Sequence, residues 1–264
     1  MPLPLHKDQY SSVWVFTKRS KLLKVYTNGK MEEKSAPTSI ASVSFSPDNT
    51  LWILPENIGL ANNHLLYSED EGQNWVRVDI KNLKISKISS THLGSCFILT
   101  LQGAIHLVQK SGEVNTIFDD GTANDMAVSP EGYIWIISRL KKEGGGNLVF
   151  WCALDNYVLQ PAYGQPVAKR ISAGPEGTAR IITTGNEVAS LYLNRMGGLE
   201  TSGGERFAKD IAASCGSNTI WVITTEKSKK KKHNVLKFWN PELDGFMKWH
   251  TVPDVEPILI TGGD

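Results

Sequence analysis

The sequence has few cysteines and no long apolar run. Its 264 residues include 3 cysteines, Cys96, Cys152 and Cys215, which are widely spaced and lie in or beside apolar segments. This odd number and spacing argue against a disulfide framework and a zinc site, and favour reduced thiols in a core. No stretch approaches the roughly 18 apolar residues of a membrane-spanning helix, and no basic start followed by an apolar segment resembles a signal peptide. We therefore expect no membrane span and a cytoplasmic protein, for which non-classical release is possible.

The sequence also lacks a dominant charge and a metal-binding motif. It has 28 basic and 27 acidic residues, so no overall field would attract nucleic acid or an anionic membrane. Its 6 histidines do not occur at metal-ligand spacings. The glycine-rich segments are not placed between a strand and a helix, as a phosphate-binding loop would be. We therefore expect no nucleic-acid partner, no metal and no cofactor.

What the sequence does contain is a repeated hairpin pattern. Each copy has a short run of apolar and small residues, a turn, and then an aromatic or β-branched run, which predicts two antiparallel strands. Five copies begin at Ile40, Ile85, Asn124, Lys169 and Lys209. A sixth is split between the chain ends, with its first strand near residues 258–260 and its second near residues 13–16. Pairing these two strands would close a ring and remove exposed strand edges.

A second pair of strand signals follows each hairpin, so each unit has four strands. The linker between the second and third strands is long in alternate units, which indicates that a pair of units was duplicated. One position of the second strand is filled in turn by Trp14, Trp52, Phe97, Trp135, Arg180 and Trp221. Large aromatic residues at this position are expected to pack between neighbouring sheets.

These patterns predict an all-β fold, a six-bladed β-propeller with pseudo-threefold symmetry and terminal strand closure. We expect a single domain over residues 1–264, with blade pairs at about 10–84, 85–168 and 169–254, and a C-terminal strand at 255–260 that closes blade one. No helical periodicity of useful length competes with this interpretation.

Residues 68–75 match the Asp-box pattern S-x-D-x-G-x-x-W, with Ser68, Asp70, Gly72 and Trp75 at the defining positions. In such a hairpin the Asp and Ser side chains bond backbone groups of the turn, while glycine adopts the unusual backbone conformation. The Asp70 carboxylate is therefore expected to bond amides of its own hairpin and to have a structural role.

No group of residues indicates catalysis. A glycosidase would need two carboxylates at a defined separation, or a tyrosine with an arginine cluster, and the acidic residues here lie mostly in turns. We therefore predict that the protein is not an enzyme and has no catalytic residues.

The segments 126–137 and 211–223 are similar to the repeat of the tectonin family of β-propeller lectins. That resemblance implies a carbohydrate-binding protein with a glycan or glycoprotein ligand, although Phe97 and Arg180 depart from the repeat, so six equivalent sugar sites are not expected. The unit also resembles those of NHL-repeat and two-component regulator propellers. The alternative function is a scaffold that binds a protein partner.

Ligand contacts are expected on the face that carries the three long linkers, since loops on a rigid scaffold often carry function. Asn and His side chains there can both donate and accept hydrogen bonds. The candidate ligand-binding residues are Asn62, Asn63, His64, Lys142, Glu143, Asn147, Lys232, His233 and Asn234. The lysine-rich segment 227–233 is either a solvated loop or a contact for phosphate or an acidic sugar. The alternative for all of these residues is that they only cap strand ends.

Overall fold

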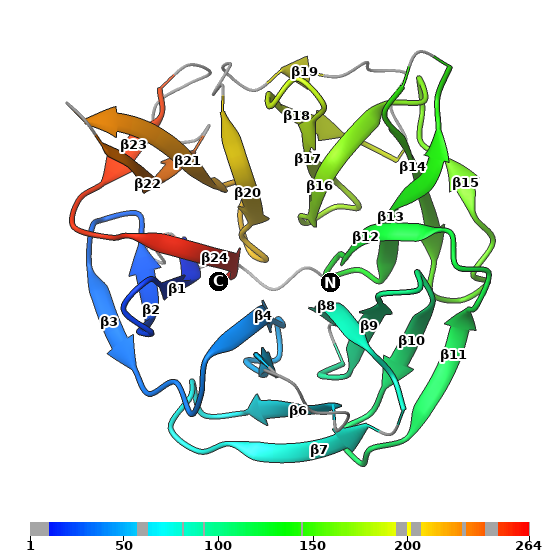
Figure 1. Ribbon diagram of the computed structural model, residues 1–264, viewed down its shortest axis with the longest axis horizontal. Helices are drawn as coiled ribbons and strands as arrows, with labels where there is room; N and C mark the ends of the chain where they lie inside the picture. The colour runs from blue at the N-terminus through cyan, green and yellow to red at the C-terminus, as the bar shows by residue number, and fades with distance from the viewer. Residues whose placement is uncertain are drawn as a thin grey trace.

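The computed structural model describes residues 11–56, 63–80, 82–91, 93–143, 145–193, 200–201, 207–228, 231–240 and 248–263. Every regular element in these ranges is a β-strand, and the strands are grouped around a central axis (Figure 1). Within the described residues, no helix is long and apolar enough to cross a membrane. The structure is all-β and has the radial arrangement of a propeller.

The strands form groups of four, which we name blades one to six, each beginning with the strand nearest the axis. Blade one consists of β24 (Pro257–Gly262), β1 (Ser12–Thr17), β2 (Leu22–Tyr26) and β3 (Met31–Lys34). Blade two consists of β4 (Ile40–Phe45), β5 (Leu51–Pro55), β6 (Asn63–Ser68) and β7 (Val76–Ile80). Blade three consists of β8 (Ile85–Ser90), β9 (Cys96–Thr100), β10 (Ile105–Val108) and β11 (Val114–Phe118).

Blades four and five are joined into one eight-stranded sheet, whereas the other blades are separate four-stranded sheets. Blade four consists of β12 (Ala123–Val128), β13 (Tyr133–Lys141), β14 (Asn147–Ala153) and β15 (Gln160–Pro161). Blade five consists of β16 (Val167–Ala173), β17 (Ala179–Thr183), β18 (Val188–Leu191) and β19 (Glu200–Thr201). Blade six consists of β20 (Ala208–Ala213), β21 (Ile220–Ser228), β22 (Lys231–Trp239) and β23 (His250–Val252). The junction is a short antiparallel pairing of β14 with β16, in which Asn147 lies opposite Ala168.

The predicted closure of the ring is confirmed. Strand β24 pairs antiparallel with β1, so that Val13 lies opposite Gly262 and Val15 lies opposite Ile260 (Figure 1). At Gly262 the closing strand passes so near blade six that an added Cβ would collide with the backbone oxygen of Ala213. The glycine is therefore required by the close approach of β24 to β20.

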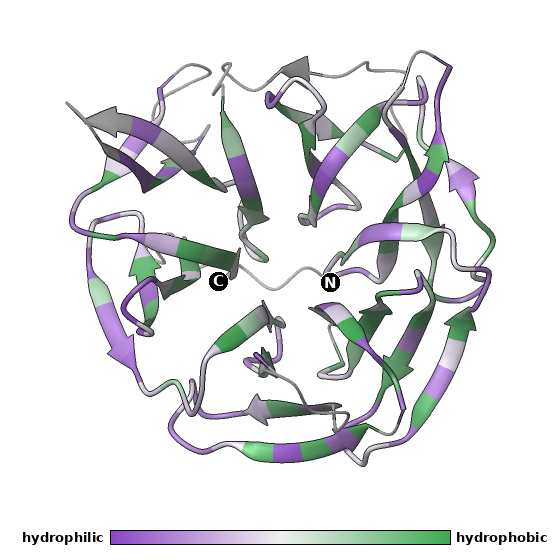
Figure 2. Ribbon diagram, in the orientation of Figure 1, coloured by the Kyte–Doolittle hydropathy of each residue, from purple (hydrophilic) through white to green (hydrophobic). Residues whose placement is uncertain are grey.

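The core lies between neighbouring blades. The four tryptophans at the repeated second-strand position, Trp14, Trp52, Trp135 and Trp221, have exposed fractions of only 0–1%. Trp14 packs with residues of β4 and β5 such as Val43 and Leu51, so it joins blade one to blade two. Apolar residues recur along the strands of each blade (Figure 2). The predicted role of these aromatic side chains in packing is confirmed, and it removes them from any ligand surface.

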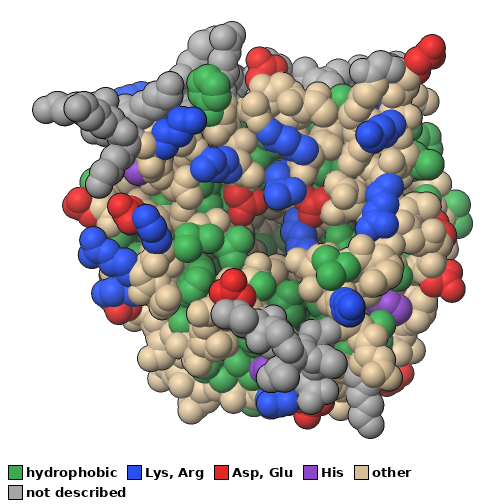
Figure 3. Space-filling view, in the orientation of Figure 1, with side chains coloured by type: hydrophobic (Ala, Val, Ile, Leu, Met, Phe, Trp, Pro, Cys, Tyr) green, Lys and Arg blue, Asp and Glu red, His purple; other side chains and the backbone are tan. Residues whose placement is uncertain are grey.

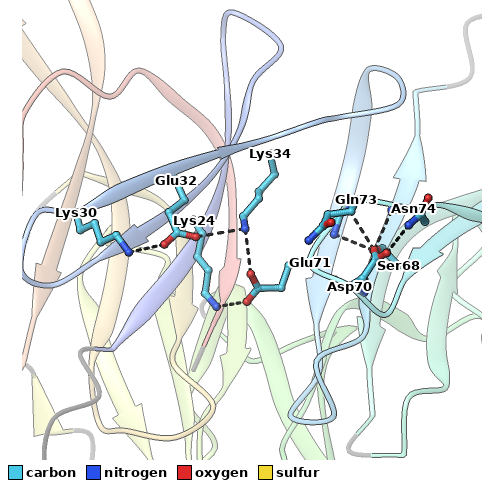
Figure 4. Close-up of polar contacts among 10 residues, drawn as sticks. Lys24, Lys30, Glu32, Lys34, Ser68, Asp70, Glu71, Gln73 and Asn74 are labelled. Carbon is cyan, nitrogen blue, oxygen red and sulfur yellow. Dashed lines mark hydrogen bonds and ion pairs between the residues drawn. The ribbon is translucent and has the colours of Figure 1, made fainter.

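The Asp-box hairpin has the predicted geometry (Figure 4). Oδ1 of Asp70 accepts hydrogen bonds from the backbone amides of Asn74, at 2.8 Å, and Gln73, at 3.1 Å, and from the Ser68 hydroxyl, at 2.7 Å. Gly72 has a φ of 84°, which favours glycine. The amide of Asn74 and the Ser68 hydroxyl are the main groups that lower the pKa of Asp70 to about 2. The carboxylate is thus satisfied by its own hairpin.

The same turn also links blade two to blade one. Glu71 accepts a hydrogen bond from Lys24 Nζ at 2.7 Å and another from Lys34 Nζ at 3.0 Å (Figure 4). Lys24 is only 4% exposed, and its ammonium group lies 5.8 Å from the centre of the Trp14 ring. Because a buried ammonium group needs a counter-charge, Glu71 fixes the position of the hairpin relative to blade one.

Candidate functional site: the mouth of the central channel

Each inner strand has a β-bulge or a shift in register near its first residues. A bulge inserts an extra residue and redirects the side chains that follow it. The shifts lie between Ile40 and Ser42, Ile85 and Lys87, Ala123 and Asp125, Ala168 and Arg170, and Ala208 and Asp210. In blade one the corresponding shift lies where Phe16 and Thr17 pair with Leu259 and Pro257.

The residues that follow these shifts surround one cavity of about 410 Å³ at the axis of the ring. In blade order from two to six and then one they are Ser42, Lys87, Asp125, Arg170, Asp210 and Leu259. We call this set the channel ring. Its charges alternate over four successive blades, and Figure 3 shows basic and acidic side chains gathered around the central hollow. Lys209 and Asn234 also line the cavity.

The channel ring lies at the end of the channel next to the three long linkers, which we call the loop face. In blades two, four and six, the residues at the start of the inner strand pair with residues at the end of the second strand. Ile40 lies opposite Pro55, Ala123 lies opposite Ser138, and Ala208 lies opposite Thr224. The cavity therefore lies on the side of the protein that the sequence predicted for ligand contacts.

Lys87 and Asp125 form a fixed ion pair in this ring. Lys87 Nζ lies 2.5 Å from Asp125 Oδ1, and the Asp125 residue is only 3% exposed. The other carboxylate oxygen, Oδ2, accepts a hydrogen bond from the backbone amide of Ile171 at 3.2 Å. The Asp125 carboxylate of blade four thus links the Lys87 side chain of blade three to the backbone of blade five.

Asp210 occupies the equivalent position in blade six but has a different environment. The pKa of its carboxyl is raised to about 6, mainly by burial and to a small extent by the charge of Asp125, while Lys87, the Ile211 amide and Arg170 oppose the rise. Its proton is therefore gained or lost near neutral pH. Perturbed carboxyl groups of this kind are common in functional clefts.

The structure brings the blade-six candidates close to the channel. Asn234 Oδ1 accepts a hydrogen bond from Lys209 Nζ at 2.9 Å, and its amide nitrogen donates one to the backbone oxygen of Pro257, also at 2.9 Å. Lys232 lines a pocket between blades five and six, and His233 lines a groove between blades six and one. Asn234 is the candidate that contributes directly to the channel cavity.

The segment 227–233 is not simply a loop, because its described part is an extended hairpin. Strand β21 continues to Ser228 and β22 begins at Lys231, with Lys227 opposite Lys232. Backbone pairing therefore continues through the charged residues on both sides of the turn. Residues 229 and 230 lie outside the described residues.

Those candidates from blades two and four whose side chains the structure describes do not line the channel cavity. His64 lies on β6 opposite Asp79, and its Nδ1 is buried without a hydrogen-bond partner among the described residues. Lys142 donates to the backbone oxygen of Gln165 at 3.2 Å, Glu143 is exposed, and Asn147 begins β14. Asn62 lies outside the described residues, and Asn63 begins β6 with its side chain also outside them.

The channel ring itself was not predicted from the sequence. Its signal is a polar or charged residue two positions after the first residue of the inner strand. This position reads Ser42, Lys87, Asp125 and Asp210 where the strands begin at Ile40, Ile85, Ala123 and Ala208. When the same position of a repeated inner strand holds different polar residues in different blades, that position is a candidate for lining the channel.

Comparison with known proteins identifies the fold. No protein-family model and no curated protein matches the sequence. Among solved structures, TolB from Acinetobacter baumannii has a TM-score of 0.71 at 13% identity, over 97% of this chain and 67% of that one. YCF48 bound to D1 peptide has a TM-score of 0.56 at 19% identity, over 94% and 80%. The gluconolactonase XC5397 from Xanthomonas campestris has a TM-score of 0.59 at 11% identity, over 95% and 87%. These propellers have varied functions, so the class defined here is a β-propeller.

Proposed function

We propose that the protein is a non-enzymatic scaffold that holds a peptide segment of a partner protein at the channel mouth. The observation that carries this proposal is the alternating charge of Lys87, Asp125, Arg170 and Asp210 around one cavity. A ring with both signs of charge suits a ligand that presents both signs as well as hydrogen-bonding groups, and a peptide does so with its backbone, side chains and termini.

The size of the cavity supports a chain end or a few side chains as the bound group. A volume of about 410 Å³ lies within the range of small-ligand pockets. This volume is far too small for a folded domain. Within the ring, Asp125 is already held by Lys87 and the Ile171 amide. Arg170, which is exposed, and Asp210 therefore supply the charges that a partner would meet.

The likeness to known structures is compatible with this proposal. One of the similar propellers was determined bound to a peptide, as the name YCF48 bound to D1 peptide states. That likeness supports peptide binding as one use of this fold.

Carbohydrate binding, implied by the tectonin resemblance, stays a prediction with less support from the geometry. The tryptophans of the repeat are fully buried and cannot stack on a sugar. Among the described residues, the aromatic side chains most open to solvent are those of Tyr163 and Phe207, at 59% and 67%. A sugar site would have to be built on such individual positions instead of on the repeat.

A selection from a displayed library of random peptides tests the proposal, with a glycan array run in parallel. We expect the protein to enrich charged peptides, and Arg170→Gln to weaken the binding of those peptides about tenfold through the loss of one charged contact. Lys30→Gln is the matched control, because Lys30 is 63% exposed in the turn between β2 and β3, at the opposite ends of the strands.

Equal binding by wild type and Arg170→Gln would remove the channel ring from the site. Binding of glycans without enrichment of any peptide would replace this proposal with the lectin interpretation.

A further inference from the structure

A second cavity lies on the loop face between blades five and six, beside the channel. It has a volume of about 970 Å³, and its basic lining residues are Lys169, Arg170, Lys209 and Lys232. Asn186, Thr225 and Phe207 complete most of the lining. Within the part of the chain that the structure describes, no acidic side chain lines this pocket. Figure 3 shows basic side chains gathered over β16 and β20, next to the central hollow.

The basic groups here are held by neutral oxygen atoms. Lys169 Nζ donates to Asn186 Oδ1, and Lys209 Nζ donates to Asn234 Oδ1 at 2.9 Å. Arg170 donates to the backbone oxygen of Lys169 at 3.0 Å. Among the described residues, none of these three forms an ion pair with a carboxylate. Burial lowers the pKa of Lys169, and the nearby charge of Arg170 adds to that effect.

An acidic group next to the pocket residue Lys209 belongs to the channel. Asp210 lines the channel cavity and feels the charge of Arg170, but it does not line this pocket. Lys169 and Lys232 line the pocket and do not line the channel cavity. The pocket therefore has a basic wall of its own, which it shares with the channel only through Arg170 and Lys209.

Phe207 adds an apolar surface to this wall. It has a φ of 76°, a conformation that bulky residues rarely adopt, and its side chain is 67% exposed. Such unusual backbone conformations are concentrated at ligand-binding sites. The phenyl ring of Phe207 thus lines the basic pocket, where it can contact an apolar part of a bound molecule.

We propose that this pocket binds a phosphate monoester whose phosphate contacts the lysines and whose apolar or aromatic part rests on Phe207. A phosphate monoester carries about −1.5 to −2 charges and three acceptor oxygens, so it matches several cations better than a single carboxylate does. The inference does not depend on peptide binding in the channel.

Isothermal titration calorimetry with phenyl phosphate, inorganic phosphate and benzoate tests the site. We expect phenyl phosphate to bind more tightly than inorganic phosphate, and benzoate to bind at least about tenfold more weakly than phenyl phosphate. Lys169→Gln and Lys232→Gln should each weaken phenyl phosphate binding about tenfold. Lys142→Gln is the matched control, since Lys142 is an exposed lysine of the same face that does not line the pocket.

Phe207→Ala separates the two parts of the site, because it should weaken the binding of phenyl phosphate while leaving inorganic phosphate unchanged. Melting temperatures of all variants should be measured to exclude loss of folding. Because Lys232 is exposed, Lys232→Gln is the variant least able to disturb the fold. A phosphotyrosine peptide that binds more tightly than phenyl phosphate would make a protein the source of the phosphate. Equal affinity would make it a small phosphate ester, and both results support the site.

Absence of phosphate binding, equal binding of benzoate, or equal weakening by Lys142→Gln would overturn the proposal. Peptide binding that survives in Lys169→Gln and Lys232→Gln would leave the channel function standing if the phosphate site fails. Phosphate binding without peptide enrichment would leave the phosphate site standing and remove the proposed channel function.

Discussion

Asp70 and Asp210 are the same residue type in two regions of the molecule, and their carboxyl groups behave in opposite ways. Asp70 accepts hydrogen bonds from its own turn, which lower its pKa to about 2. Asp210 lies at the channel, where burial raises its pKa to about 6. A carboxylate that its own hairpin satisfies has a structural role, whereas one whose environment is assembled from several blades is left able to respond to a ligand.

The two groups therefore affect stability with opposite dependence on pH. The pKa of Asp70 is lowered, so its contribution is present above the unfolded value of 3.8 and is lost as the pH falls toward 2. The pKa of Asp210 is raised from 3.8, so its contribution is fully present below that value and is lost as the pH rises through about 6.

The largest effect is expected at Asp125, the ion-paired member of the channel ring. Asp125→Ala removes the partner of Lys87 and of the Ile171 amide, and breaking a buried ion pair typically costs about 3 kcal/mol. Urea unfolding at pH 7 should record that loss in the free energy of unfolding. A cost below about 1 kcal/mol would mean that the ion pair of Asp125 and Lys87 behaves as a solvent-exposed pair, in which water replaces the lost partner.

Asp210→Asn should have the opposite sign. The amide cannot ionise, so the variant should be more stable than wild type at pH 8 by roughly 1–2 kcal/mol, in keeping with the raised pKa. Urea unfolding between pH 4 and pH 8 should also show that wild type loses this stability as the pH rises and that the variant does not. A variant that is less stable than wild type at pH 8 would show that the Asp210 charge is well paired.

The smallest of the three effects is expected at Asp70. Asp70→Ala leaves the amides of Gln73 and Asn74 without their acceptor, so the melting temperature should fall by a few degrees at pH 7. The difference from wild type should shrink as the pH approaches 2, because the native carboxyl begins to take up its proton there. Binding of selected peptides should be unchanged, and a loss of binding without a change in melting temperature would assign Asp70 to a ligand site.

These contrasts explain how much the sequence could predict. The alternating runs and turns of each hairpin are local, so the strands, the closure of β24 on β1 and the role of Asp70 followed from the order of residues. Asn234 was the candidate that proved to line the channel. Lys87, Asp125 and Asp210 were overlooked, because their orientation depends on bulges and their environment on side chains from other blades.

The lysine-rich linker of blade six also differs from the expectation. A run of lysines is usually solvated, so the segment 227–233 was considered a loop. Residues 220–228 and 231–239 instead pair along their full length, because the backbone hydrogen bonds of an antiparallel ladder do not depend on side-chain polarity. Charge alone therefore did not mark the end of these strands.

The pairing of β24 with β1 also determines when the ring can form in a cell. Residues 257–262 are translated after every other described strand, so β1 has no partner on its inner edge until the ribosome has passed them. Until that moment the nascent chain exposes an unpaired strand edge, the kind of surface that promotes association with other chains. Blade one, which contains the earliest and the latest of the described strands, β1 and β24, is therefore the last of the six blades to be completed.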